Sequence, residues 1–126
     1  EEGHLELGSL NGTFNYDLID GHVFINPSAT GGNYTPNFRV DSNTSLASKM
    51  NTGEVISVTL IVASSSHYCT NTASIDGSTS NITRVWVGGS PPSSANGSGY
   101  DIYSFTIIKT SIAPAYILIG NTISAA

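Results

Sequence analysis

The sequence predicts an all-β domain, an antiparallel β-sandwich of jelly-roll-like form with about eight or nine short strands. Short alternating or apolar runs bounded by Gly, Pro, Asn and Asp recur along the 126 residues, whereas few stretches keep a helical spacing. Ser, Thr and Asn together supply 43 residues, against a charged fraction of 10%. These polar side chains suit strands and turns. At this length we expect a single domain, residues 1–126.

The N-terminal part predicts three strands. Residues 5–10 indicate the first, within an N-terminal arm or docking strand that spans residues 1–11. Residues 14–18 alternate between apolar and polar side chains, so one face of this strand should be buried. Asp20-Gly21 favours positive φ angles, and we therefore predict a tight hairpin that returns through residues 22–25.

The central part predicts an edge strand, one helical segment and the core strand. Tyr, Phe and Val side chains share one parity across residues 34–40, but Pro36 cannot donate a hydrogen bond, which favours an edge or bulged strand. Residues 45–50 are the best helical candidate, at most two turns long. Residues 54–64 give the strongest β signal, and Leu60 is expected near the centre of the core.

The C-terminal part predicts a second hairpin and two final strands. Asp76-Gly77 separates residues 70–75 from residues 82–87, which we expect to pair with each other. Apolar and aromatic residues then predict a strand over residues 100–108. Pro114 separates that strand from the last, residues 116–119.

Charge and hydropathy exclude two classes of partner. The formal net charge is −5, which argues against a surface that neutralises phosphates, and we expect no nucleic acid partner. The longest apolar stretch, residues 58–63, is far shorter than the roughly 20 residues that span a bilayer. We therefore expect no membrane insertion.

No spacing in the sequence predicts catalysis or a cofactor. His4, His22 and His67 show no metal-ligand spacing, although symmetry could bring one histidine from each of several subunits together. No serine lies in G-x-S-x-G. Asp20 and Asp76 each precede glycine, where turn formation explains them. We expect no enzyme, no metal site and no cofactor.

The aromatic side chains allow two interpretations. Tyr34 and Tyr100, together with the amide of Asn96, are candidate glycan contacts, because an aromatic face beside an amide suits a pyranose ring. Such residues more often pack a core and direct a polar tip outward. Trp86 lies between Val85 and Val87 on the opposite parity, so a neighbouring subunit could cover one face of this strand.

Three segments resemble a known family. They are residues 84–92 (RVWVGGSPP), residues 99–109 (GYDIYSFTIIK) and residues 116–121 (YILIGN). Together they resemble the C-terminal domain found repeatedly in structural proteins of tailed bacteriophages, especially those that infect cyanobacteria. That domain carries a W-x-G-G-x-x-P turn, a D-[IV]-[YW]-x-F strand and a closing strand with a glycine. The likeness extends over most of the chain from about Gly12, but residues 65–70, with His67 and Cys69, have no counterpart.

The resemblance implies a virion component without catalytic residues. It implies a head fibre, a capsid decoration protein or a tail-fibre domain at the particle surface, commonly a homotrimer that contacts other capsid or tail proteins. A glycan-binding module at a fibre tip, which recognises a host surface glycan, is the alternative. Trp86, Leu60 and Phe105 are the candidate anchors of a subunit interface or of the core. The solitary Cys69 is expected to be a small buried hydrophobe.

Overall fold

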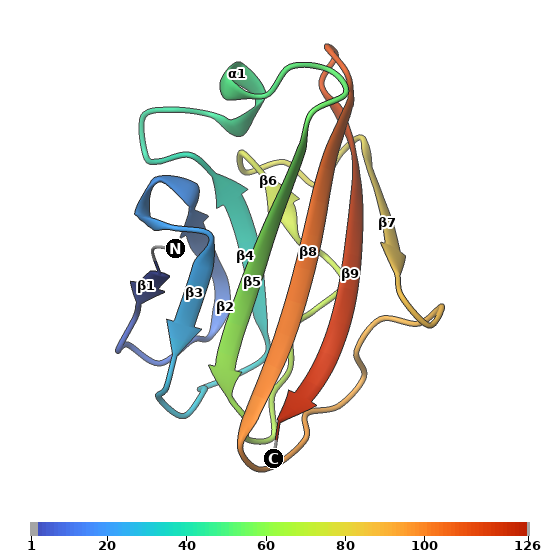
Figure 1. The fold of residues 1–126 in the computed structure, drawn as a ribbon. Coiled ribbons are helices and arrows are strands. Elements are labelled where there is room, and N and C mark those ends of the chain that lie inside the picture. The colour runs from blue at the N-terminus through green and yellow to red at the C-terminus, as the bar shows by residue number, and fades with distance from the viewer. Residues whose placement is uncertain (1–2, 126) are drawn as a thin grey trace.

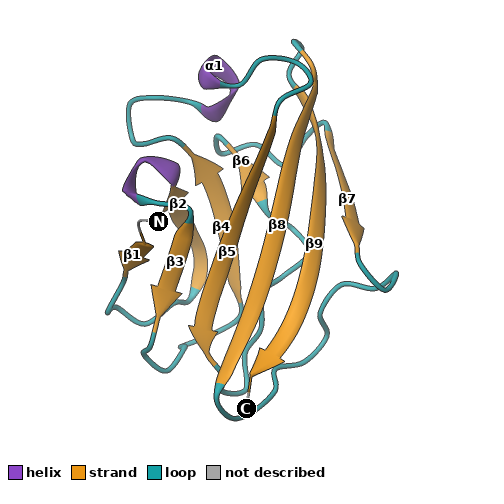
Figure 2. Ribbon diagram, in the orientation of Figure 1, coloured by secondary structure: helices purple, strands orange, loops and turns teal. Residues whose placement is uncertain are grey.

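The chain folds into two β-sheets that face each other (Figure 1). The computed structural model describes residues 3–125. The front sheet has six strands, in the order β1 (Gly3–Leu5), β3 (Val23–Asn26), β5 (Val55–Ala63), β8 (Tyr100–Ser111), β9 (Ala115–Ala125) and β7 (Ile82–Trp86). The rear sheet has three, in the order β2 (Gly12–Asp17), β4 (Tyr34–Arg39) and β6 (Ser74–Ile75). Helical structure within the described residues is confined to the 3₁₀ turn η1 (Leu18–Asp20) and the single turn α1 (Leu46–Lys49) (Figure 2). The predicted β architecture is confirmed at this level.

The predicted antiparallel, jelly-roll-like pairing is wrong, because most neighbouring strands run parallel. Five of the seven strand pairings among the described residues are parallel, and only β5 with β8 and β8 with β9 are antiparallel. From β1 to β7 the chain alternates between the two sheets. A strand that returns to its sheet after one crossing in each direction runs the same way as the strand it left. Because these successive strands alternate between the sheets, the neighbours that they form within each sheet run parallel, although each connection along the chain only crosses from one sheet to the other.

Both hairpins predicted at Asp-Gly turns are corrected by this alternation. After β2, η1 and Gly21 carry the chain into the front sheet, so β2 and β3 lie in different sheets. Asp76 and Gly77 do form a tight turn, with φ angles of 53° and 79°. This turn closes only the pair of Ile75 and Ser78, since β6 and β7 belong to different sheets. Positive φ at both central positions is the type I′ geometry that the residues predicted.

Strand β4 is central in its sheet, although Pro36 predicted an edge. All its residues except Arg39 are buried. Tyr34 pairs on one side with the Cys69 segment, and Phe38 pairs on that same side with β6. Pro36 lies between these two partners, opposite the stretch where the neighbouring chain leaves the ladder. Its missing N–H group therefore leaves no gap in the hydrogen bonding.

The three longest strands lie where the sequence predicted them, and β8 and β9 extend beyond the predicted ends. β5 covers the expected core segment, and Leu60 on it is fully buried. β8 and β9 form the one long hairpin, with Pro114 in its turn as expected. The N-terminal arm contributes β1, which pairs in parallel with β3 at the edge of the front sheet; Glu1 and Glu2 lie outside the described residues.

Helix α1 also confirms its prediction, at one turn. Ser45 is its N-cap, and the Ser45 Oγ accepts a hydrogen bond from the Ser48 N–H at 3.1 Å. Lys109 on β8 is buried beneath its C-terminal end. Its Nζ donates to the carbonyl oxygens of Ala47 at 2.7 Å and Met50 at 2.8 Å. A side chain of the front sheet thus satisfies carbonyl groups that the end of the helix leaves open.

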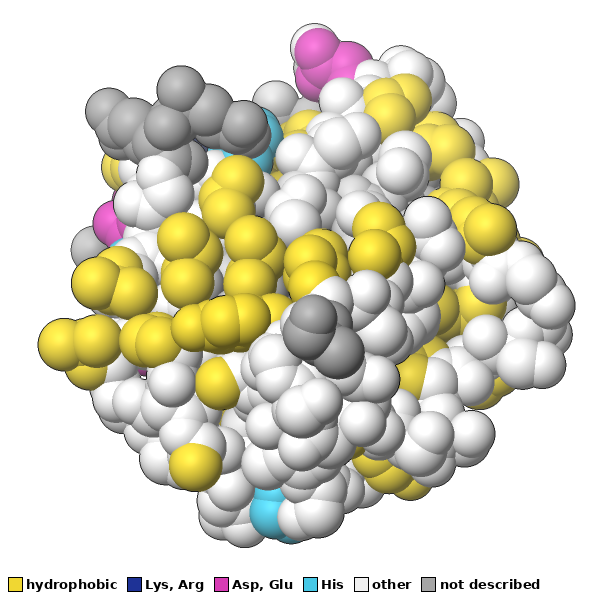
Figure 3. All heavy atoms as spheres, turned by 60° about the horizontal axis from the view of Figure 1, so that its bottom comes forward, with side chains coloured by type: hydrophobic (Ala, Val, Ile, Leu, Met, Phe, Trp, Pro, Cys, Tyr) yellow, Lys and Arg dark blue, Asp and Glu magenta, His cyan; other side chains and the backbone are white. Residues whose placement is uncertain are grey.

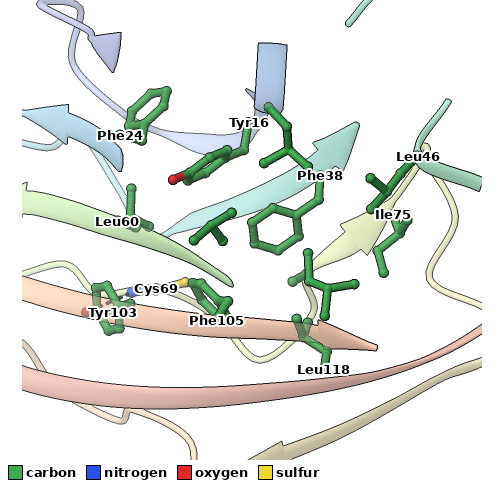
Figure 4. Packing of buried hydrophobic residues seen from close by; sticks show 14 of the residues in the cluster. Tyr16, Phe24, Phe38, Leu46, Leu60, Cys69, Ile75, Tyr103, Phe105 and Leu118 are labelled. Carbon is green, nitrogen blue, oxygen red and sulfur yellow. Dashed lines mark hydrogen bonds between the residues drawn. The ribbon is translucent and has the colours of Figure 1, made fainter. Parts of the chain in front are cut away.

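Aromatic rings fill the space between the sheets (Figure 4). Tyr16 and Phe38 from the rear sheet meet Phe24 and Phe105 from the front sheet. The ring centroids of Tyr16 and Phe24, Tyr16 and Phe38, and Phe38 and Phe105 are each 5.3 Å apart. Tilted and edge-to-face rings at this separation attract one another beyond the area that they bury. The core is thus a connected row of aromatic contacts across the interior.

Candidate functional site

The three candidate anchors, Leu60, Phe105 and Trp86, all pack in or against the hydrophobic core of this chain. Leu60 and Phe105 are 0% and 1% exposed, so both are core residues that no partner subunit can reach. Trp86 is partly buried against the core, and its ring meets Phe105 edge-to-face at 5.8 Å. Its Nε1 donates to the Asn71 Oδ1 at 2.6 Å. All three anchors therefore stabilise this chain itself.

Gly120 leaves room for the Trp86 ring, because it has no side chain. The two residues are directly paired across β7 and β9. A Cβ atom at position 120 would lie 2.5 Å from the Trp86 ring, a distance that packed atoms do not reach. The indole therefore occupies the space that a side chain would need. The W-x-G-G turn, the D-I-Y-S-F strand and the glycine of the closing strand meet at this point.

The candidate glycan contacts are separated by the fold. Tyr34 is 0% exposed, and its ring packs against Tyr103 at 6.2 Å, so its proposed contact with a surface glycan is wrong. Asn96 and Tyr100 are exposed and lie close to each other at the start of β8. The Asn96 N–H donates to the Asp101 Oδ1 at 3.1 Å. Only these two members of the predicted trio share a surface.

Buried Asp101 fixes the loop that carries Asn96. Asp101 is 2% exposed, and its Oδ2 accepts a hydrogen bond from the Ser64 hydroxyl at 2.8 Å. The Ser64 Oγ in turn accepts from the Gly97 N–H at 2.8 Å. The loop is therefore attached to Asp101 of β8 through the Asn96 N–H and to Ser64 after the end of β5 through the Gly97 N–H, which holds the loop before Tyr100 in place.

The segment without a counterpart in the resembled family has a structural role. Cys69 pairs with Tyr34 beside β4, and its N–H donates to the Tyr103 hydroxyl at 3.2 Å. His67 Nδ1 lies 3.1 Å from the Thr30 hydroxyl. Cys69 is fully buried, as expected, and burial raises the pKa of its thiol. A buried neutral thiol is a poor nucleophile.

The histidines do not gather into a metal site. No group of three or more His, Cys, Asp or Glu side chains that could hold a metal ion occurs within residues 3–125. His4 lies against Phe24 with ring centroids 5.1 Å apart, while His67 is bonded to Thr30. None of the helices in the described part of the chain is long and apolar enough to cross a membrane.

Two hollows share Ser45 and Asp76 at the end of the sandwich beside α1. One has a volume of about 380 Å³ and is lined by polar residues that include Arg39 and Asp41. The other, of about 270 Å³, is lined by Tyr116 among others. Asp76 accepts the N–H groups of Leu46 and Ala47 at 2.6 and 3.0 Å, so its carboxylate serves the start of α1. Arg39 is likewise engaged, because its Nε donates to the Asp17 Oδ1 at 2.6 Å.

The outer face of the front sheet carries a row of aliphatic side chains, which the sequence did not predict as a unit. The direct register partners from strand to strand are Leu5, Ile25, Ile61, Ile102 and Ile123. Leu5 and Ile123 at the two ends are 59% and 46% exposed. The three central isoleucines are half-buried between their neighbours. We call these five residues the aliphatic row.

The aliphatic row belongs to a wider apolar surface. Apolar side chains form a continuous band across the sheet when the lower end of Figure 1 is brought forward (Figure 3). A second set of direct partners on this face joins Val55, Ile108 and Ile117. Ser, Thr and Asn occupy several of the positions between the two sets. Exposed apolar surface of this extent, with a polar surround, is typical of an interaction surface.

Neither a protein-family model, nor a curated protein, nor a solved structure matches the chain.

Proposed function

We propose that the chain is a non-enzymatic structural module of a tailed-bacteriophage virion, which decorates or cements the capsid or forms a fibre domain as a homotrimer. The observation that carries the proposal is the meeting of Trp86, Phe105 and Gly120. These residues come from the three segments that resemble the phage domain, and they pack into one unit. The motif therefore has a physical reason to occur as a set.

The chemistry of the described side chains agrees with a structural role. The candidate anchors and Cys69 are engaged in packing, while Asp76 and Arg39 are engaged in hydrogen bonds within the chain. The contact of Thr30 with His67 comes nearest to a nucleophile beside a base. Thr30 is only 8% exposed, however, and its hydroxyl also contacts the Ser65 hydroxyl at 2.7 Å. This contact attaches one loop to another.

Mass spectrometry of purified phage particles, followed by cryo-microscopy, tests the proposal. We expect the protein at the surface of the head or of a fibre, in groups of three around local threefold axes. Particles from which the protein is absent would overturn the assignment. A position on the particle without threefold grouping would overturn the trimer alone.

A glycan-binding module at a fibre tip is the second candidate function. Asn96 and Tyr100 favour it, because an exposed amide on a loop that Asp101 and Ser64 hold in place is followed closely along the chain by an exposed aromatic ring at the start of β8. This combination suits a sugar ring, which stacks on an aromatic face and hydrogen-bonds to amides.

Glycan arrays probed with the intact assembly test this second function. We expect Tyr100→Ala to lose binding, while Tyr68→Ala serves as the matched control because Tyr68 is partly exposed on a different segment. No binding by the unmodified assembly, or equal binding by both variants, would exclude Tyr100 as a glycan contact.

A further inference from the structure

We propose that the outer face of the six-stranded sheet is a self-association surface, which is buried against neighbouring copies of the same chain. The inference deepens the proposed function and rests on it for the role of the assembly. The aliphatic row, its surroundings, their charge and their area carry it.

The aliphatic row is a register feature, because each member is the direct partner of the next across five strands. Directly opposed side chains on one face of a sheet touch, so the row forms a continuous ridge. The interior of the sandwich lies on the other side of these strands, where Phe24, Leu60 and Tyr103 are buried. Nothing within residues 3–125 covers the ridge, since the three-stranded sheet packs on the opposite face.

The charge distribution selects another copy of this chain as the occupant. The formal net charge is −5, so two copies repel each other over most orientations. Among the described positions that face outward from β3, β5, β8 and β9, the residues are aliphatic, Ser, Thr, Asn, Ala or Tyr, and none is Asp, Glu, Lys, Arg or His. A strongly basic or acidic partner would find no complementary charge on this surface. A second neutral apolar face meets it without burying an unpaired charge.

The dimensions of the face suffice for a specific interface. Six strands span roughly 24 Å across the sheet, and the nine residues of β5 span roughly 30 Å along it. The product is about 700 Å², close to the roughly 800 Å² that each partner contributes to a standard interface. Two β-sheets also stack naturally face to face, with interdigitated side chains at about 10 Å separation. The face is therefore large enough to be buried against the sheets of neighbouring copies.

Sedimentation equilibrium and native mass spectrometry of the full chain at micromolar concentration test the inference. We expect an oligomer for the unmodified protein. Ile102→Lys, at the centre of the aliphatic row, should weaken association by at least about 100-fold, because the interface would bury an unpaired charge. Ile112→Lys is the matched control: Ile112 is 90% exposed in the turn between β8 and β9, outside the sheet face. This control should associate like the unmodified protein.

A milder variant separates loss of association from loss of folding. Ile61→Thr combined with Ile102→Thr keeps β-branched side chains on both strands, and it should stay folded by amide NMR while association weakens. A monomeric unmodified protein would overturn the inference, as would a folded Ile61→Thr/Ile102→Thr variant that associates normally.

The same measurements separate this inference from the proposed function. An oligomer of any size that depends on the aliphatic row supports the self-association surface, even when particles contain no copy of the protein. A protein that is found on particles, but whose aliphatic row remains accessible there, supports the function and overturns the surface.

Discussion

Trp86 and Gly120 depend on each other, because the indole ring occupies the volume of a missing side chain. Gly120→Ala should destabilise the protein by about 1–3 kcal/mol, as overpacking does, since the added Cβ would lie 2.5 Å from the ring. Chemical denaturation followed by the fluorescence of the single tryptophan measures the change.

Gly3→Ala is the matched control for Gly120→Ala. Gly3 also lies in a strand of the front sheet, but a Cβ there would meet its nearest atom at 3.4 Å. If both variants lost the same stability, the contact with Trp86 would not be the cause. Combining Gly120→Ala with Trp86→Leu should lose less than the sum of the two single changes, which a double-mutant cycle detects.

Buried acids predict a loss of stability at alkaline pH. Burial raises the pKa of the Cys69 thiol and of the Tyr34 hydroxyl, and it raises the pKa of Tyr103 to about 12. The folded state therefore keeps these protons where the unfolded state releases them, from about pH 8.5 for cysteine and about pH 10 for tyrosine. The stability that they contribute is complete below those values and is lost as the pH rises, by up to about 1.4 kcal/mol per pH unit for each group.

Urea denaturation between pH 7 and pH 12 measures this dependence. Cys69→Ala should remove the part of the decline that begins near pH 8.5 and leave the part that begins near pH 10. In the folded protein the Cys69 thiol should react with a thiol reagent only as fast as the protein opens. A constant urea midpoint up to pH 12 would contradict the burial of these groups.

At the scale of elements, α1 depends on two side chains from distant strands and turns. Asp76 accepts the N–H groups at its start, and Lys109 donates to the carbonyl oxygens of Ala47 and Met50 at its end. Lys109→Met keeps the length of the buried stem but removes both hydrogen bonds, and it should cost about 1–3 kcal/mol. Thermal unfolding measures the loss. Lys49→Met, which changes an exposed lysine on α1, should lie within about 0.5 kcal/mol of the unmodified protein.

The sequence predicted elements far better than their partners. β5 and β8 lie where local alternation and β-branched residues placed them, and α1 lies within the predicted helical segment 45–50, because these signals act within a few residues. The hairpins at Asp20-Gly21 and Asp76-Gly77 were wrong, since a turn signal does not specify which sheet the next strand joins. Pairing is decided by contacts between residues far apart in the chain, which no local pattern records.

Features of the candidate site could be predicted only where the alternation within a single strand determines them. Alternation placed Trp86 on the opposite face from Val85 and Val87, and in the structure Trp86 packs against the core while the two valines are 44% and 60% exposed. The aliphatic row could not be found in this way, because it exists only through the register of five strands. The parity of Ile61 or Ile102 is visible in the sequence, but not the fact that they are direct partners.

At the scale of the whole molecule, the two surfaces of the front sheet have different roles. Its inner surface, with the aromatic contacts of Phe24 and Phe105, holds the two sheets together. Its outer surface carries the aliphatic row, which nothing within residues 3–125 covers. The proposed assembly would complete this division, because the sheet would then be buried on both sides.

The alternation of strands between the sheets also sets the order in which the fold can form. Most neighbours in each sheet are separated by a full crossing to the other sheet and back, and the long β8–β9 hairpin is the main local pairing. Such a topology has a high contact order, and proteins of this kind fold slowly. The hairpin also inserts between β5 and β7, which precede it in the chain. The six-stranded sheet therefore cannot be completed during synthesis until the ribosome has released β9. Until β8 emerges, β5 has no partner on that side, and until β9 emerges, β7 has no partner in the sheet.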